Sequence, residues 1–144
     1  MNHIAIFHCP IQIIKRSIGK SAVAAAAYRS GERLVNEWDG MTHDYTHKGG
    51  IVHTEIMLPA HAPPEFQDRS TLWNSVEQIE KASDAQLARE IEVALPVELS
   101  PAAQLALVRS FVKDNFVDAG MCADFAIHDK GTGNPHAHIL LTIR

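Results

Sequence analysis

This sequence lacks long apolar runs, paired cysteines and a strong excess of either charge. Its 144 residues contain no apolar run of roughly 18 or more, the length that a membrane-spanning helix needs. The opening MNHIAIFHCP has no basic flank before a long apolar core, so we expect no signal peptide. Cys9 and Cys122 match neither a metal-binding spacing nor a disulfide framework. We therefore expect a cytoplasmic protein with reduced, buried thiols and no membrane insertion.

Charge is modest overall but unevenly placed along the chain. The formal net charge of −4 argues against a generally cationic nucleic-acid binder. The charged side chains of residues 61–100 are mainly acidic. Up to residue 36, by contrast, Glu32 is the one acidic side chain among several basic ones, which are Lys15, Arg16, Lys20, Arg29 and Arg33. The basic N-terminal third is either a phosphate-binding patch or a solvated surface, and composition leaves both open.

Apolar patterning predicts strands and helices in the order β-α-β-α-β-α-β-β. Proline at position 10 indicates an edge strand or a bulge in the first strand. Glycine at 31 and at 120 is expected to end the first and third helices, and Ser100-Pro101 to begin the third. The strands are expected at 3–16, 49–59, 88–96, 121–129 and 136–144, and the helices at 20–31, 68–82 and 100–120.

This order predicts an α+β fold. It is too irregular for a doubly wound parallel sheet, and it ends in a hairpin. We expect a mainly antiparallel sheet with helices largely on one face. A chain of this length with 46% hydrophobic residues suits one domain, residues 1–144, with a real core. It stops at Arg144 directly after a strand, as an N-terminal fragment of a longer protein would.

Two histidines open the last expected strand, in GNPHAHILLT. His136 and His138 are two residues apart, so both rings share one strand face. A hairpin turning through 129–135 places His128 opposite His136 and diagonal to His138, about 5 Å and roughly 7–8 Å away. Three imidazoles so placed suggest zinc or another transition metal with an open position. The alternative is a chance grouping on a wet sheet face, in a protein with nine histidines.

Tyr28 stands in AVAAAAYRSGER, on a helix whose neighbouring side chains are methyl groups. Such small residues let a helix lie close to a sheet and leave a phenol room to reach past it. Arg29 and Arg33 are near enough to hold phosphates. The alternative is a core tyrosine with a satisfied hydroxyl, which is the commoner case.

Taken together, five segments resemble, in order, the characteristic blocks of the MobA/MobL family of plasmid mobilisation relaxases, which are HUH endonucleases. The joint occurrence of AAYRSG near the start and NPHAH near the end is highly specific, and the resemblance covers nearly the whole chain. The family's His-hydrophobic-His pair is matched by His136, Ala137 and His138. The segments are AIFHCPIQIIKRSIGKSAVAAAAYRSGERL, DYTHKGGIVHTEIMLP, TLWNSVEQIE, QLAREIEVALP and ADFAIHDKGTGNPHAHILLT.

The resemblance implies the HUH relaxase fold, an antiparallel five-stranded sheet with helices packed on it. It implies a metal-dependent, site- and strand-specific DNA endonuclease and strand transferase. His128, His136 and His138 would bind Mg²⁺ or Mn²⁺, where spacing had suggested zinc. Tyr28 would attack one phosphodiester at a plasmid origin of transfer, form a 5′-phosphotyrosine and release a 3′-hydroxyl. Because this ester is close in energy to the diester, the enzyme would rejoin the strand after conjugative mobilisation.

The resemblance also assigns a strand carboxylate, matched by Glu90, that would orient a metal-bound histidine or take the phenol's proton. Glu92 shares that strand face, so the choice between the two stays open. Lys15, Arg16 and Lys20 would contact the DNA backbone, which positions a strand without reading its sequence. The implied partners are single-stranded or supercoiled plasmid DNA at the origin of transfer, relaxosome accessory proteins and a coupling protein.

The chain differs from the family, and two other classes of protein are alternatives to a relaxase. Family members are often longer, and the helix expected after the last strand is missing. One competing class is a three-histidine metalloenzyme acting on a small molecule, which predicts a closed apolar pocket and gives Tyr28 no task. The other is a non-catalytic DNA-binding module, which explains the basic third of the chain and leaves the histidines unused.

Overall fold

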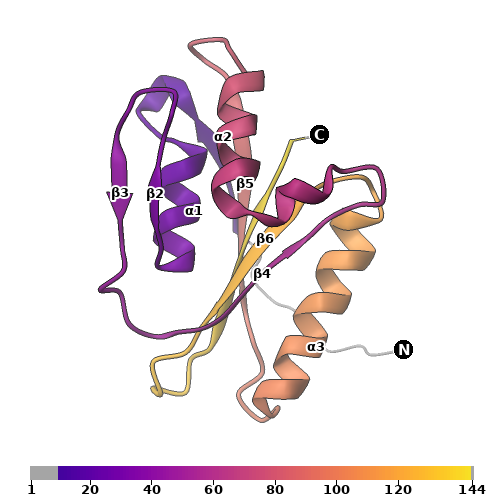
Figure 1. Cartoon of the computed structure of the whole chain (residues 1–144). Helices are drawn as coiled ribbons and strands as arrows, with labels where there is room; N and C mark the ends of the chain where they lie inside the picture. Colours follow the sequence, from indigo (N-terminus) through magenta and orange to yellow (C-terminus); the bar gives the residue numbers. More distant parts are fainter. Residues whose placement is uncertain (1–9, 144) are drawn as a thin grey trace.

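A five-stranded antiparallel sheet forms the centre of the computed structural model, which describes residues 10–143 (Figure 1). The strand order across the sheet is β1-β5-β7-β6-β4, and every neighbouring pair runs antiparallel. This arrangement confirms the predicted α+β class. The strands are β1 (Ile11–Lys15), β4 (Ile51–Met57), β5 (Gln86–Ala94), β6 (Ala123–His128) and β7 (His136–Leu141).

Helices cover both faces of the sheet, where the sequence led us to expect them largely on one. The α1 (Ala22–Ser30) and α2 (Arg69–Ile79) helices pack on one face, and α3 (Pro101–Val112) packs on the other (Figure 1). The reason is that nearly every residue of β6 and β7 is buried, so both faces of these strands need a covering layer. Phe125 and Ile139 contribute to the core under α3, whereas Leu140 contributes to the core under α1 and α2.

The register of the terminal hairpin agrees with the sequence prediction. His128 lies directly opposite His136, and His138 lies opposite Ala126. The loop between β6 and β7 contains Gly131 and Gly133, both with positive φ, which suits the tight reversal. All three histidines therefore share the face that α1 covers.

Short side chains bring α1 close to the sheet. Ala22, Ala26 and Ala27 are buried in its inner face, and alanine has the highest helix propensity. The Ser21 side chain accepts a hydrogen bond from the Ala24 N–H and so caps the first turn. Gly31, with φ of 72°, ends the helix in the left-handed conformation, as the sequence predicted.

A buried ion pair joins α2 to the sheet. Arg69 donates from Nε and Nη2 to both carboxylate oxygens of Asp124 on β6, at 2.7 and 2.8 Å. The indole N–H of Trp73 donates to the same carboxylate at 2.9 Å. The buried carboxylate of Asp124 is therefore fully paired, and this pairing offsets the cost of burying its charge.

Two elements were not expected from the sequence. A second, two-stranded sheet pairs β2 (Arg33–Val35) with β3 (Thr42–Asp44). Strands of three residues are too short for an alternating pattern to stand out. The third helix ends in a π-helical turn, Lys113–Val117, before Gly120. The expected strand start, residues 3–9, and Cys9 lie outside the described residues, whereas Cys122 is a buried free thiol, as expected.

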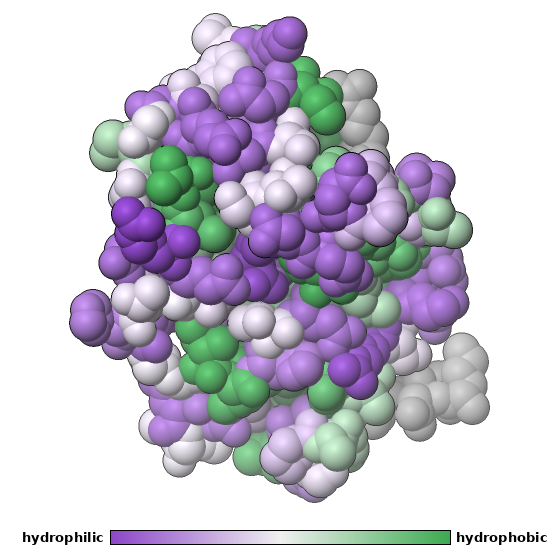
Figure 2. Space-filling model, in the orientation of Figure 1, coloured by the Kyte–Doolittle hydropathy of each residue, from purple (hydrophilic) through white to green (hydrophobic). Residues whose placement is uncertain are grey.

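Figure 2 shows a largely hydrophilic face on which apolar side chains form separate small groups. Scattered apolar residues of this kind are normal on a protein surface. In the part of the chain that the structure describes, no helix is both long and apolar enough to cross a bilayer.

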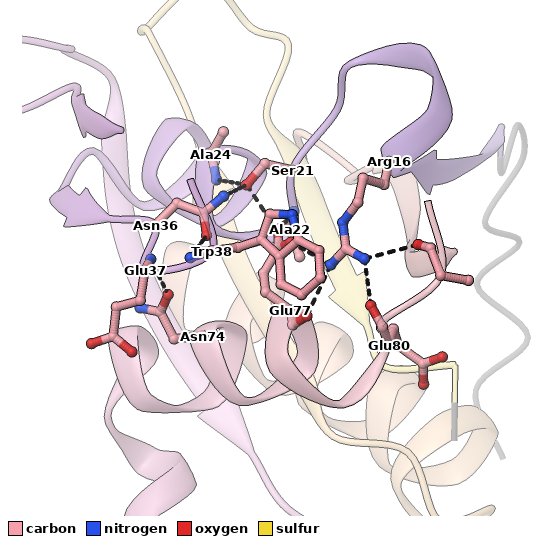
Figure 3. Close-up of polar contacts among 11 residues, drawn as sticks. Arg16, Ser21, Ala22, Ala24, Asn36, Glu37, Trp38, Asn74, Glu77 and Glu80 are labelled. Atoms are coloured by element: carbon pink, nitrogen blue, oxygen red, sulfur yellow. Dashed lines mark hydrogen bonds and ion pairs between the residues drawn. The ribbon is translucent and has the colours of Figure 1, made fainter. Parts of the chain in front are cut away.

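A buried polar network joins α1 and α2 to the 3-10 turn, Arg16–Ile18, that follows β1 (Figure 3). Glu77, which is 1% exposed, accepts hydrogen bonds from the Ser21 hydroxyl and the Ala22 N–H at 3.0 and 2.8 Å. Arg16 donates to the other Glu77 oxygen at 3.0 Å and to main-chain carbonyls at the end of α2. The Trp38 ring lies 3.8 Å from the Arg16 guanidinium carbon. One carboxylate thus holds the start of α1 on α2.

Replacing Glu77 by alanine leaves Arg16 without its counter-ion and α1 without part of its cap. We expect Glu77→Ala to lower the free energy of unfolding by about 3–5 kcal/mol, the usual cost of breaking a buried ion pair. Urea unfolding followed by circular dichroism measures the loss. Glu98→Ala removes an exposed carboxylate and serves as the control, with an expected change within about 0.5 kcal/mol. Similar losses in both variants would contradict the role given to Glu77.

Candidate functional site

Tyr28 lies on the last turns of α1, and its side chain is held by the turn that follows β3. The residue is 41% exposed. Tyr45 packs edge-on against its ring, with centroids 5.0 Å apart and planes at 86°. The Lys48 ammonium lies 3.5 Å from the ring centroid and donates to the Tyr28 carbonyl at 2.8 Å. The phenol is therefore accessible while its ring is fixed, which is not the arrangement of a core tyrosine.

A bidentate ion pair lies beside the phenol. Arg29 donates from Nε and Nη2 to the two oxygens of Glu90, at 2.5 and 2.9 Å. Its guanidinium carbon also lies 4.8 Å from the centre of the Tyr28 ring. Glu90 is 6% exposed, so the pair is anchored on β5. Two predicted site residues that lie 61 positions apart in the sequence are thus bonded to each other.

The three predicted histidines form a cluster on the same sheet face. The rings of His128 and His138 have centroids 4.5 Å apart, and those of His136 and His138 are 6.4 Å apart. Glu92, opposite His138 on β5, places its carboxylate oxygens 3.8 Å from His136 Nε2 and from His138 Nδ1. The two carboxylates left open by the sequence therefore differ in position. Glu90 contacts Arg29, and Glu92 is near the imidazoles.

The histidine cluster is tied to the end of α1. His128 donates from Nε2 to the Arg29 carbonyl at 2.9 Å. The adjacent carbonyl, that of Tyr28, accepts from Lys48. These bonds satisfy two of the carbonyls that a helix C-terminus leaves free, and they fix the end of α1 that carries Tyr28 next to the cluster.

Burial keeps two of the imidazoles neutral. Burial, followed by the positive charges of Arg29 and the neighbouring groups, lowers the pKa of His138 to about 3. Burial likewise lowers the pKa of His128. Lys48 is in a similar position, since burial and then Arg29 and Lys130 lower its pKa to about 8. Neutral imidazole is the form that coordinates metals.

The fit to a metal ion rests on the kind of donors present. His138 Nδ1 is buried and has no hydrogen-bond partner among residues 10–143, which leaves a nitrogen lone pair or N–H without a partner. However, no group of three or more His, Cys, Asp or Glu side chains in that range is arranged to hold an ion. The expected convergence of ring nitrogens is absent, because His128 Nε2 is engaged by the Arg29 carbonyl. The imidazole nitrogens are donors of a kind that fits a divalent ion.

A recess of about 290 Å³ opens over the cluster. Polar and charged residues line it, including Lys130, Thr132 and Asn134 from the loop between β6 and β7. The small-molecule metalloenzyme predicted a closed apolar pocket, and this recess does not have that character. Its lining combines one cation, Lys130, and one carboxylate, Glu92, with hydrogen-bonding groups, so it suits a polar rather than an apolar ligand.

The predicted basic residues are not equivalent in the structure. Arg16 belongs to the buried network under Trp38, so its donors serve the fold. Lys20 and Arg33 are exposed, and Lys15 is half-buried at the end of β1. Sequence reasoning passed over Lys48, which contacts the Tyr28 ring. Its position in DYTHKGG, next to a turn, gave no signal that it would meet a residue 20 positions earlier.

The depressed pKa of His138 makes stability depend on pH when no metal is present. In the unfolded chain this imidazole takes up a proton near pH 6.5, whereas in the folded protein it stays neutral down to about pH 3. Its contribution is therefore complete above pH 6.5 and is lost as the pH falls. In EDTA, we expect the wild type to lose up to about 1.4 kcal/mol per pH unit more than His138→Gln between pH 6.5 and 4.5. Parallel urea-unfolding curves would contradict this.

Known proteins resemble this chain over most of its length. The family model described as MobA/MobL matches residues 20–144. The conjugal transfer protein TraA of Rhizobium radiobacter is 43% identical over 98% of this chain, and the mobilization protein MobL of Acidithiobacillus ferridurans is 38% identical over 96%. The chain spans 14% of the first protein and 43% of the second.

A solved structure shares the fold. It is described as "Molecular Basis of Vancomycin Resistance Transfer in Staphylococcus aureus" and superposes with a TM-score of 0.91 at 35% identity. The match covers 97% of this chain and 71% of that one. With the family match over residues 20–144 and this shared architecture, the chain belongs to the MobA/MobL family.

Proposed function

We propose that this chain is a relaxase domain that nicks one DNA strand at a plasmid origin of transfer and later rejoins it. The observation that carries the proposal is an exposed phenol, Tyr28, on the helix whose C-terminal end is bonded to a cluster of histidines, two of which burial keeps neutral. Family membership supports it, since the relatives are named mobilization and conjugal transfer proteins. The reaction takes place in the cytoplasm, where plasmid DNA is found.

Tyr28 acts as the nucleophile. Its oxygen forms a bond to the scissile phosphorus while the bond from phosphorus to the 3′-oxygen breaks, with the two oxygens in line. A 5′-phosphotyrosine and a 3′-hydroxyl result, and the reverse attack by that hydroxyl rejoins the strand. The phenol proton passes to solvent, because the side chain is exposed, and a solvent proton completes the 3′-hydroxyl on the leaving oxygen. The Lys48 and Arg29 cations beside the ring offset the charge that develops on the phenol oxygen.

The two carboxylates take separate roles in this proposal. Glu90 fixes Arg29 through a bidentate bond, so that the guanidinium stays beside the phenol and the scissile phosphate. Glu92 is the carboxylate that orients His136 and His138, because it lies 3.8 Å from a nitrogen of each. The sequence had favoured Glu90 for the histidines or for the phenol's proton.

His128, His136 and His138 would hold a divalent ion, Mg²⁺ or Mn²⁺. When bound, such an ion supplies Lewis-acid polarisation of a phosphate oxygen. The neutral state of His138 and its unpartnered Nδ1 support this assignment.

The DNA backbone would pass along basic residues that other groups leave accessible. The exposed Lys20 and Arg33 and the half-buried Lys15 are available for this contact, and Arg29 contributes Nη1, the guanidinium nitrogen that does not bond Glu90. Single-stranded or supercoiled plasmid DNA is the substrate, and relaxosome accessory proteins and a coupling protein are the expected partners.

The nucleophile is tested by Tyr28→Phe, which removes one oxygen and keeps the ring. We expect no covalent adduct with single-stranded origin DNA in Mn²⁺, because phenylalanine has no oxygen to bond phosphorus. The free energy of unfolding should change by no more than about 1 kcal/mol, the value of one hydrogen bond. A denaturing gel detects the adduct as a shifted band.

Tyr45→Phe is the matched control for that experiment. Tyr45 packs against the Tyr28 ring through its own ring, which the variant keeps, so the adduct should still form. Adduct formation by Tyr28→Phe together with its loss in Tyr45→Phe would reassign the nucleophile. Wild type that forms no adduct would overturn the proposed function.

Metal binding is tested independently of activity by titrating Mn²⁺ into the protein in a calorimeter. We expect the wild type to bind one ion and His136→Ala to bind it at least about tenfold more weakly, since an imidazole donor is lost. His136 is half-buried, so its truncation should leave the fold intact. His61→Ala, at an exposed loop position, should bind as the wild type does. Equal Mn²⁺ affinity in all three proteins would remove the histidine cluster as the metal site.

A further inference from the structure

A second recess adjoins Tyr28, on the opposite side from the histidine cluster. It is a groove of about 300 Å³ between α1 and β1, and Tyr28, Arg29 and Glu90 line one end of it. The strand order separates the two recesses. The groove is bounded by β1 and β5, whereas the histidine recess is bounded by β5, β7 and β6. The Arg29–Glu90 pair therefore stands between them, with the nucleophile at the border.

The walls of the groove differ from those of the histidine recess. Ala24 and Ala25 on α1 and Ile14 on β1 give it an apolar lining with little side-chain bulk. Ala24 lies one turn before Tyr28, so the two side chains occupy the same helix face. At the far end the exposed Lys20 contributes a positive charge. A flat apolar wall between a nucleophile and a cation matches one nucleoside followed by a phosphate.

We propose that this groove binds the nucleoside on the 3′ side of the cleaved phosphate, with its base against Ala24 and Ala25 and the next phosphate at Lys20. The inference rests on the proposed function and goes further, since it assigns each side of the cut to its own recess. Charge complementarity supports this occupant, because the exposed Lys20 places a positive charge at the end of the groove where the next phosphate would lie.

In-line attack decides which side of the cut occupies the groove. The attacking and leaving oxygens lie on opposite sides of phosphorus. The nucleotide that leaves with the 3′-hydroxyl must therefore lie across phosphorus from Tyr28, toward the histidine recess. The nucleoside that stays attached to phosphorus through its 5′-oxygen is free to lie on the Tyr28 side, where the groove begins. That nucleoside is the one retained in the phosphotyrosine.

Gln12 gives the groove a means of telling bases apart. It lies on β1 two residues from Ile14, on the same strand face, and its exposed amide is part of the groove wall. A glutamine amide carries both a donor and an acceptor, which can pair with a base edge. Gln12 is therefore a specificity-determining residue for the first nucleotide after the cut.

Ala24→Leu tests the groove, because leucine keeps the helix propensity of α1 and fills the space beside Tyr28. Binding is measured by fluorescence anisotropy in the Tyr28→Phe background, which prevents cleavage. The probes are origin oligonucleotides centred on the phosphate that the wild-type adduct identifies. One is intact, one lacks the first base on the 3′ side, and one lacks the first base on the 5′ side. Ala106→Leu, on the exposed face of α3, is the matched control.

We expect loss of the 3′ base to weaken binding to the parent protein about tenfold, within the range for a base seated on a protein surface. Ala24→Leu should bind the intact probe as weakly as the parent binds the probe without the 3′ base, and it should not distinguish these two probes. Loss of the first base on the 5′ side should weaken binding by the same factor in both proteins. Ala106→Leu should behave as the parent.

Gln12→Ala supplies a second variant that leaves the helix unchanged. It should bind probes with any base at the first 3′ position almost equally, where the parent prefers one base by about tenfold. Unchanged binding by Ala24→Leu, or equal losses on the intact and 3′ abasic probes, would overturn the groove assignment. That result is distinguishable from failure of the proposed function, in which the wild type forms no adduct.

Discussion

The buried carboxylate of Glu77 is the constraint on which the site depends. It is bonded to the first turn of α1 and to Arg16, and it lies on α2, so it fixes one helix on the other and both on the turn that follows β1 (Figure 3). α1 has only nine residues. A shift at its start therefore reaches Tyr28 within two turns. A purely apolar contact would permit sliding, whereas directional bonds to a single carboxylate do not.

The two faces of the sheet differ in composition and in role. The face under α3 is apolar along β6 and β7, with Phe125, Ile127 and Ile139 in one core. The face under α1 and α2 contains the ion pairs and the imidazoles alongside its apolar residues. Successive side chains of a strand point to opposite faces, so the same strands provide the apolar face and the polar face. The apolar face supplies a full core, which lets the other face carry buried charge near the reacting groups.

Much of this arrangement could be predicted from the sequence, and the exceptions have common causes. Strand alternation and the turn-rich loop sufficed to place His128 opposite His136, since both are local signals. The side of the sheet that α3 covers was missed, because β6 and β7 carry buried residues on both faces and so do not indicate which face a helix covers. The hairpin of β2 and β3 was too short to show a pattern.

Within the site, the residue types could be predicted but their pairings could not. Arg29 and Glu90 are 61 positions apart, and nothing local indicates that they bond. The same holds for Lys48 and Tyr28, and for Arg16, which sequence grouped with the DNA contacts and the fold uses internally. Such pairings depend on which strands become neighbours, and that is decided by tertiary packing.

The two side-chain bonds to the end of α1 have a mechanical consequence. Under the proposed function, a DNA strand esterified to Tyr28 would transmit any pull on the DNA to the main chain at that residue. The carbonyl of Tyr28 is held by Lys48 and that of Arg29 by His128, and His128 belongs to a strand in the middle of the sheet. Tension would thus be shared between the helix and the sheet, and the short helix would resist unwinding from its loaded end while the strand is drawn away.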